Sequence, residues 1–191
     1  VVVPEADRHD GVLVWLHGGG WVIGDLDTSE SVARRLAALA GCVVVSVDYR
    51  LAPEVQAPHP FEDAWAATRW VADHLEELGL PADARVAVGG DSAGGNLAAL
   101  VAVRAAESGG PALALQLLVY PGVDLTGGHP SMDENGEGYF LTREQMEWFG
   151  AHYVPDGADL ADPSLSPLFV PVETLAGVAP AHVIVAGYDP L

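Results

Sequence analysis

The fold is decided by the stretch Ala87-Val88-Gly89-Gly90-Asp91-Ser92-Ala93-Gly94-Gly95-Asn96. The apolar run at 85–88 predicts a β-strand that stops at two glycines, and helical spacing begins at Asn96. Between strand and helix, Gly90, Ser92 and Gly94 form a Gly-x-Ser-x-Gly motif. Small residues on both sides permit a strained turn that exposes the Ser92 hydroxyl above a sheet. An ordinary glycine-rich turn is the alternative, but the strand before and the helix after favour a nucleophilic serine.

Strands and helices alternate along the 191-residue chain. Apolar runs predict strands at 12–16, 42–47, 85–88, 113–120 and 183–186, and helical spacing predicts helices at 29–40, 61–78, 96–106 and from 142 to about 153. We expect Val32, Leu36, Leu39 and Ala40 to form the inner face of the first helix. The alternation predicts an α/β fold, with a mostly parallel central sheet and helices on both faces in three layers.

The region 122–171 is looser than the rest of the expected single domain, 1–191. Glycine, proline and acidic residues dominate it until Thr142 and Gln145, whose spacing predicts a capping box and a partly helical excursion. Lying between two expected core strands, the region shapes a binding cleft or is a surface excursion packed on the core. Both readings stay open.

The charge of the chain bounds its partners. Its net charge is −19, and all eight basic residues are arginine. Such an acidic surface repels nucleic acids and anionic membranes, so we expect neither as a partner. We expect a small-molecule partner instead, and a cytoplasmic location. The single cysteine, Cys42, excludes an internal disulfide and is expected to be a buried, inert thiol.

A second glycine motif, His17-Gly18-Gly19-Gly20, follows the strand expected at 12–16. Active sites assemble at this edge of a parallel sheet, and glycines let a loop turn its amides toward a substrate carbonyl. Loops of this type form half of the oxyanion hole in lipases and esterases. We therefore expect Gly18, Gly19 and Ala93 to supply the oxyanion donors. A flexible turn is the alternative. A phosphate-binding loop is not expected, because neither a following lysine nor a Gly-x-Gly-x-x-Gly pattern is present.

These motifs resemble the hormone-sensitive-lipase-like branch of the α/β-hydrolase superfamily, particularly its bacterial esterases. The matching stretches occur in the family's order over nearly the whole chain: His17-Gly18-Gly19-Gly20-Trp21, Asp48-Tyr49-Arg50-Leu51-Ala52-Pro53-Glu54, Gly90-Asp91-Ser92-Ala93-Gly94-Gly95-Asn96, Asp162-Pro163-Ser164-Leu165-Ser166-Pro167-Leu168 and Tyr188-Asp189-Pro190-Leu191. The resemblance implies hydrolysis of small, short-to-medium acyl esters through an acyl-enzyme on Ser92, with no metal and no organic cofactor.

The resemblance also implies the catalytic acid. The family places it in an Asp-Pro-Leu motif just beyond a core strand, which corresponds to Asp189; a plain turn aspartate before proline is the alternative. We expect Asp91 to shape the serine turn, Asp48 and Asp63 to be structural, and Arg50 to pair with nearby carboxylates.

The catalytic histidine is the departure from the family. In the family it follows the acid by one helix and one strand, so we expect it to be absent from these 191 residues. His17 resembles the family's loop-stabilising histidine, and His182 is expected at the opposite sheet edge. No sequence argument favours His129 or His152 in the looser region, and His59 and His74 are expected to be solvated. We also expect the family's N-terminal cap, last strand and last helices to be missing from these residues. We therefore expect a fragment that is poorly active alone and forms part of a possible homodimer at full length.

Two other functions fit the same motifs. Acyl transfer to an acceptor other than water, or amide hydrolysis, would use the same serine and oxyanion donors. A non-catalytic, receptor-like member would keep the pocket without the catalytic histidine, as the plant gibberellin receptors of this family do. The intact serine turn, acid and glycine loop favour the enzyme.

Overall fold

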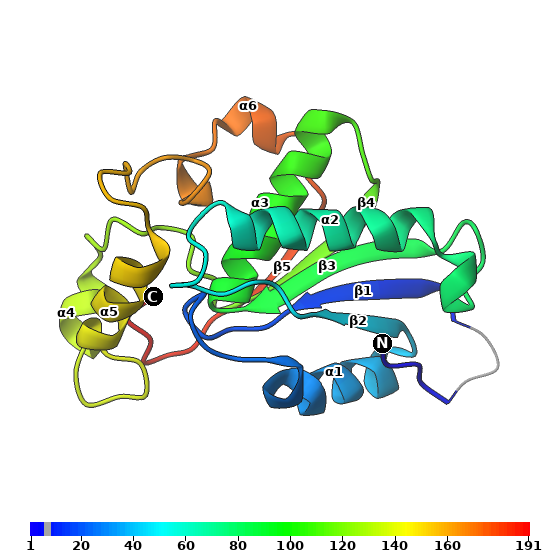
Figure 1. Ribbon diagram of the computed structural model, residues 1–191, viewed down its shortest axis with the longest axis horizontal. Coiled ribbons are helices and arrows are strands. Elements are labelled where there is room, and N and C mark those ends of the chain that lie inside the picture. The colour runs from blue at the N-terminus through cyan, green and yellow to red at the C-terminus, as the bar shows by residue number, and fades with distance from the viewer. Residues whose placement is uncertain (6–8) are drawn as a thin grey trace.

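The computed structural model describes residues 1–5 and 9–191, and a five-stranded sheet forms its centre (Figure 1). The strands are β1 (Gly11–Leu16), β2 (Val43–Val47), β3 (Arg85–Asp91), β4 (Leu113–Val119) and β5 (Ala181–Ile184). Their order is β2-β1-β3-β4-β5, and every neighbouring pair runs parallel. The α/β class expected from the sequence is therefore confirmed.

Helices cover both faces of the sheet. They are α1 (Leu26–Ala40), α2 (His59–Asp73), α3 (Ala93–Ser108), α4 (Pro130–Asn135), α5 (Arg143–Tyr153) and α6 (Val172–Leu175), with 3-10 turns at Glu76–Leu78 and Pro167–Phe169. Helix α1 lies on one face, whereas α2 and α3 lie on the other (Figure 1). Helices α4 and α5 gather at the end of the sheet where the strands finish, and the C-terminus lies beside them (Figure 1).

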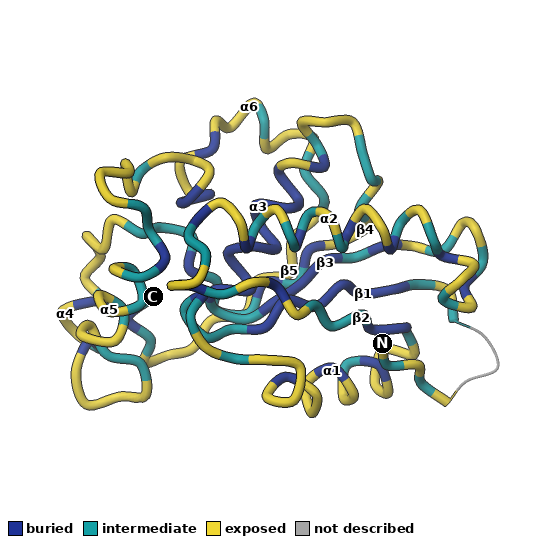
Figure 2. The backbone as a smooth tube through the Cα atoms, viewed as in Figure 1, coloured by how far each residue is buried: buried dark blue, intermediate teal, exposed yellow. Residues whose placement is uncertain are grey.

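The apolar side chains of β1 point alternately to the two faces of the sheet, and they fill a core on each face. Val12, Val14 and Leu16 pack in the core beneath α2 and α3, whereas Leu13 and Trp15 pack with alanines of α1. Figure 2 shows the buried β1 and β3 running through the middle of the molecule. Burial on both faces explains why these strands read as continuous apolar runs.

Helix α3 is buried over most of its length, since twelve of its sixteen residues are buried. Most of them are small, which lets the helix lie close to the sheet. A Cβ added to Gly94 would overlap the carbonyl group of Leu16 at the end of β1. This close approach brings the start of α3, and with it Ser92, beside the loop that leaves β1.

The expected inner face of α1 is wrong except at Leu36, which is partly buried and packs against the core. Its buried residues are Ser29, Ala33 and Ala37, whereas Leu39 is 82 % exposed and Val32 is 42 % exposed. The helix also begins three residues earlier than expected, because Asp25 and Thr28 form a capping box. Small side chains allow α1 to pack closely on β2, so size rather than hydrophobicity selects its inner face.

Other elements also differ from expectation. The helix expected at 61–78 stops at Asp73, and a separate 3-10 turn follows at Glu76–Leu78. The last strand lies at Ala181–Ile184, two residues before the range expected. The short helices α4 and α6 had no sequence signal, since each has at most six residues. By contrast, the capping box of Thr142 and Gln145 at the start of α5 is confirmed.

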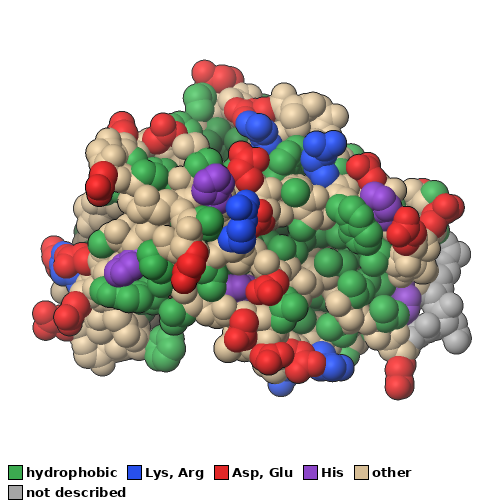
Figure 3. Space-filling model, in the orientation of Figure 1, with side chains coloured by type: hydrophobic (Ala, Val, Ile, Leu, Met, Phe, Trp, Pro, Cys, Tyr) green, Lys and Arg blue, Asp and Glu red, His purple; other side chains and the backbone are tan. Residues whose placement is uncertain are grey.

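Acidic side chains are spread over the surface, with few arginines among them (Figure 3). Within residues 1–5 and 9–191, no helix combines the length and the apolar character needed to cross a membrane.

Candidate active site

Ser92 joins β3 to α3 in a backbone conformation that is rare for L-residues, with φ 54° and ψ −117°. Its amide donates a hydrogen bond to the Val119 carbonyl of β4 (2.9 Å). Its own carbonyl accepts from the amides of Asn96 (3.0 Å) and Gly122 (3.2 Å). A Cβ on Gly90 would overlap the first turn of α3. The sheet and the helix therefore hold this strained turn in place.

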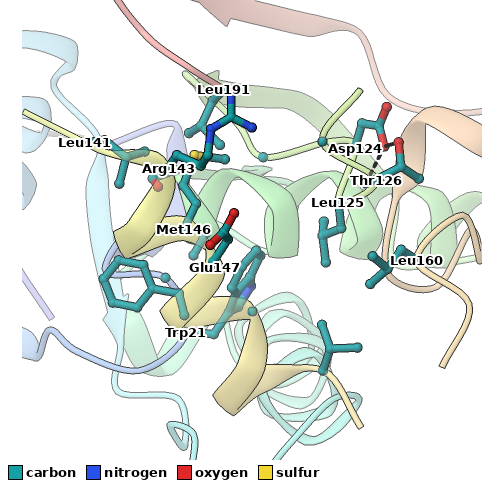
Figure 4. A pocket seen from close by; sticks show the side chains of 18 of the residues that line it. Trp21, Asp124, Leu125, Thr126, Leu141, Arg143, Met146, Glu147, Leu160 and Leu191 are labelled. Atoms are coloured by element: carbon teal, nitrogen blue, oxygen red, sulfur yellow. Dashed lines mark hydrogen bonds between the residues drawn. The ribbon is translucent and has the colours of Figure 1, made fainter. Parts of the chain in front are cut away.

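The side of the turn that carries Ser92 faces a cavity of about 480 Å³. Its wall comes from the loop after β1, the start of α3, the loop after β4 and helix α5: Gly20, Trp21, Ser92, Ala93, Gly122, Asp124, Leu125, Thr126, Gly127, Met132, Leu141, Arg143, Met146, Glu147, Phe149, Gly150, Ala151, Val154, Leu160 and Leu191. In Figure 4, Leu125 and Leu160 lie on one side, Leu141, Arg143 and Met146 on the other. The region 122–171 therefore shapes a cleft, which was the first of the two alternatives left open by the sequence.

Gly18 is not placed to bind an oxyanion, which corrects the expectation from the sequence. Its amide donates to Oδ1 of Asp91 at 3.1 Å, so the proton is already committed to a carboxylate. Gly18 is also absent from the residues that line the cavity. Burial raises the pKa of Asp91, and the hydrogen bond from Gly18 opposes that rise. Asp91 thus ties the glycine loop to the serine turn, as expected of a residue that shapes it.

The next two glycines take the left-handed backbone that brings the loop toward Ser92. Gly19 has φ 119° and Gly20 has φ 59°, and Gly20 lines the cavity with Ser92 and Ala93. In the part of the chain that the structure describes, neither the Gly19 nor the Gly20 amide has a hydrogen-bond acceptor. A Cβ on Gly20 would overlap the Phe149 ring of α5. Gly20 was missed from the sequence, although it belongs to the same glycine run.

Trp21 continues the same loop and forms a rigid wall of the cavity. Its backbone φ is 62°, and its carbonyl accepts a hydrogen bond from the Ala52 amide at 2.8 Å. Its ring stacks on Tyr153 of α5, with centroids 4.3 Å apart and planes 6° from parallel. The stack joins the glycine loop to α5.

His17 stabilises the glycine loop after β1 from its buried side. It is buried and stacks on Tyr49, with ring centroids 4.4 Å apart. Its Nδ1 lies 2.7 Å from the Gly18 carbonyl oxygen, and the Tyr49 hydroxyl donates to the His17 carbonyl at 2.6 Å. Burial raises the pKa of Tyr49, which stays a neutral donor. His17 lies outside the cavity lining.

Asp189 follows β5 on the segment that reaches the cavity. Its Oδ1 accepts a hydrogen bond from the Leu191 amide at 2.9 Å, and Leu191 lines the cavity. The pKa of Tyr120 is raised by burial and by the carboxylates of Asp91 and Asp189, so the three side chains share one end of the sheet. The structure therefore brings the Asp189 segment to the same edge as Ser92.

None of the described residues that line the cavity is a histidine. His129 lies 2.7 Å from Oδ2 of Asp124, a cavity residue, but its own side chain is 49 % exposed. His152 and His74 each cap a carbonyl one turn back in their helices. His182 lies within β5 rather than before it, and it is exposed.

A buried amide ties the cavity wall to α3. The Asn96 side chain donates to the carbonyls of Gly122 (2.7 Å) and Leu165 (2.9 Å). Next to it, the buried Ser166 hydroxyl accepts from the Leu125 amide (2.8 Å) and donates to a carbonyl at Leu160. These bonds show what the Asp-Pro-Ser-Leu-Ser-Pro-Leu stretch does in this chain: it anchors Leu125 and Leu160, two of the leucines that line the cavity.

Other charged residues hold the surrounding structure. Arg50 makes a two-pronged ion pair with Asp63, each bond 2.8 Å long, and this contact lowers the pKa of Asp63. The pairing expected for Arg50 is confirmed, while Asp48 is exposed. Among the described residues, no group of three or more His, Cys, Asp or Glu side chains could hold a metal ion.

Known proteins match this chain over almost its whole length. A family model described as "alpha/beta hydrolase fold" matches residues 13–191. The chain is 48 % identical to the carboxylic ester hydrolase LipN of Mycobacterium tuberculosis, over 98 % of this chain and 51 % of LipN. It is 46 % identical to esterase LipI of the same organism, over 94 % of this chain and 56 % of LipI. The chain thus spans about half the length of these curated relatives.

Solved structures give the same result. The hyperthermophilic esterase from the archaeon Pyrobaculum calidifontis superimposes with a TM-score of 0.91 at 44 % identity, covering 97 % of this chain and 61 % of that one.

Proposed function

Since the chain belongs to the α/β-hydrolase family, in its hormone-sensitive-lipase-like branch, we propose that it forms the nucleophile-bearing part of a serine carboxylesterase. The observation that carries this proposal is the position of Ser92, strained between β3 and α3 in the wall of an apolar cavity together with Gly20 and Ala93. The cavity of about 480 Å³ suits a small ester with a short-to-medium acyl group.

In the first half of the reaction, the Ser92 hydroxyl gives its proton to a histidine and attacks the ester carbonyl carbon. The amides of Gly19, Gly20 and Ala93 stabilise the negative oxygen of the tetrahedral intermediate. The intermediate collapses, the histidine returns the proton to the leaving alcohol, and an acyl-Ser92 ester remains. Water then attacks this ester by the same steps, which releases the carboxylic acid and free Ser92.

Asp189 orients that histidine in this proposal. The histidine itself is assigned to sequence outside these 191 residues, because no described histidine lines the cavity. Replacing His129 by Ala tests the alternative that His129, through Asp124, is the base. Turnover that survives in His129→Ala supports the external histidine, and turnover that disappears contradicts it.

The central test uses the protein that contains this chain, with p-nitrophenyl butyrate as substrate. We expect Ser92→Ala to lower kcat by roughly 10⁴- to 10⁶-fold, as for other serine nucleophiles. Ser108→Ala, an exposed serine at the far end of α3, is the matched control and should retain full activity. Unchanged turnover in Ser92→Ala would reject Ser92 as nucleophile.

The same protein separates the related activities. Product ester formed when an alcohol is added would indicate acyl transfer, and hydrolysis of the matching anilide would indicate an amidase. Ligand binding without turnover would indicate a receptor-like member. The cytoplasmic location and the homodimer stay predictions.

A further inference from the structure

One wall of the cavity is a stripe along helix α5. Met146 and Gly150 within α5, and Val154 directly after its last residue, follow one another at intervals of four residues and all line the cavity, with Glu147 beside them. Residues four apart lie one turn above another on the same face of a helix. Gly150 therefore occupies the middle of this stripe, where the helix presents no side chain.

Nothing in the described structure requires glycine at this position. Glycine is the poorest helix former after proline, and Gly150 lies inside α5 without a left-handed φ. A Cβ added to Gly150 would meet no atom within 4 Å. At Gly20, in contrast, a Cβ would overlap the Phe149 ring, so packing explains that glycine. The space beside Gly150 is part of the cavity.

From these observations we propose that Gly150 is a specificity-determining residue: its missing side chain forms a notch in the cavity for a bulky, uncharged apolar group of the ester. Branched alkyl and phenyl groups have the required shape. The inference rests on the proposed ester substrate, since it names the class of ester that the cavity prefers.

The surroundings of the notch define its chemistry. Met146 and Val154 bound it along the helix, and Trp21, Leu125 and Leu160 supply other apolar surface of the cavity. Glu147 has no ion-pair or hydrogen-bond partner in the part of the chain that is described, so it presents a free carboxylate one turn from Gly150. Arg143, the basic residue of the cavity lining, is paired with Asp133 over 2.6 Å, whereas Glu147 is unpaired among the described residues. An anionic group in the notch would therefore be repelled, and an apolar group would be desolvated favourably.

The test measures binding rather than turnover. In a Ser92→Ala background, NMR titration gives the dissociation constants of methyl acetate and methyl 3-phenylpropionate for the protein that contains this chain. A group as small as one methylene can change discrimination by roughly 10- to 200-fold in a hydrophobic pocket. We therefore expect Gly150→Leu to weaken the phenylpropionate ester by at least about tenfold and to change methyl acetate by less than about twofold.

Two further variants complete the experiment. Gly150→Ala fits the space without clash and should give an intermediate loss for the phenylpropionate ester. Glu144→Leu adds the same side chain to α5 at an exposed position outside the cavity lining, and it should leave both affinities unchanged. Equal losses for the two esters, no loss for either, or the same loss in Glu144→Leu would overturn the proposal. A Ser92 that proves unnecessary for turnover would reject the proposed function and leave the affinity ratio intact.

Discussion

The Gly18 amide donates a hydrogen bond to the Asp91 carboxylate over 3.1 Å, which joins the loop after β1 to the turn that carries Ser92. Replacing Asp91 by Ala leaves that partly buried amide without an acceptor, and an unsatisfied donor costs up to about 1–3 kcal/mol, the upper end applying to full burial. We expect Asp91→Ala to lower the free energy of unfolding in urea by this amount. Asp91→Asn keeps an acceptor oxygen and should lose less. Equal losses in the two variants would show that the hydrogen bond does not contribute.

The backbone strain at Ser92 predicts an unusual order of stability among its variants. Its φ of 54° and ψ of −117° suit glycine, whereas a side chain in such a region costs on the order of 1–3 kcal/mol. The greater backbone entropy of glycine in the unfolded chain offsets about 0.5–1 kcal/mol of this difference. We therefore expect Ser92→Gly to be more stable than Ser92→Ala by about 1 kcal/mol in urea denaturation. An alanine variant more stable than the glycine variant would mean that the strain is relaxed in solution.

Removal of the buried Asn96 amide should destabilise the whole cavity wall. Asn96→Ala leaves the carbonyls of Gly122 and Leu165 without their donor, and each unsatisfied group costs about 1–3 kcal/mol. We expect a loss of about 3 kcal/mol in the free energy of unfolding. Ser108→Ala on the exposed end of the same helix should lose less than about 0.5 kcal/mol. Similar losses in the two variants would contradict a specific role for Asn96.

The ion pair of Arg50 with Asp63 predicts a pH dependence. Arg50 lowers the pKa of Asp63, so the stabilisation is present above the unfolded pKa of about 3.9 and is lost as pH falls through the lower folded value. Because the Arg50 side chain is 56 % exposed, screening limits the effect to about 0.5–1 kcal/mol. We expect the difference in unfolding free energy between wild type and Asp63→Asn to be constant near neutral pH and to shrink below about pH 4.

A second ion pair provides the control for this measurement. Glu30 and Arg34 are one turn apart on α1, with side chains 52 % and 66 % exposed. Glu30→Gln should therefore cost only about 0.2–0.5 kcal/mol. A larger effect at Glu30 than at Asp63 would contradict the ranking by burial.

The net charge of −19 predicts that salt stabilises the fold. Raising the ionic strength from 0.1 M to 1 M shortens the screening length from about 10 Å to about 3 Å, which weakens repulsion between surface carboxylates. We expect Tm to rise by several degrees, since about 1 kcal/mol shifts it by about 2–4 °C in a domain of this size. Sodium and potassium chloride should act alike. A fall in Tm, or a rise with one cation alone, would contradict screening.

The alternation of strands and helices was predictable because every strand reads as an apolar run, most clearly β1, whose side chains are buried on both faces of the sheet. Side-chain choice within helices was less predictable. Val32 and Leu39 of α1 face solvent, while Ala33 and Ala37 face the sheet, because the distance between α1 and β2 favours small residues. The hydrophobicity of the residues alone does not reveal how closely α1 packs on β2.

The candidate site also contains features that the sequence predicted and features that it did not. Local motifs marked Ser92 and the glycine loop, because strained turns need glycine in the sequence next to them. The assignment of Gly18 as a donor was wrong, since its amide is used by Asp91, a partner 73 residues away. The role of α5 was also hidden, because the contact of Phe149 with Gly20 forms only in the tertiary structure.

The position of β1 between β2 and β3 has a consequence for biosynthesis. Gly11 at the start of β1 pairs with Arg85 at the start of β3, so β1 leaves the ribosome long before its second neighbour exists. Parallel pairing offers no hairpin that could protect β1 in the meantime, and non-local pairing of this kind slows folding. While residues 17–84 are being translated, one edge of this apolar strand is therefore unpaired. During that time it can be bound by a chaperone.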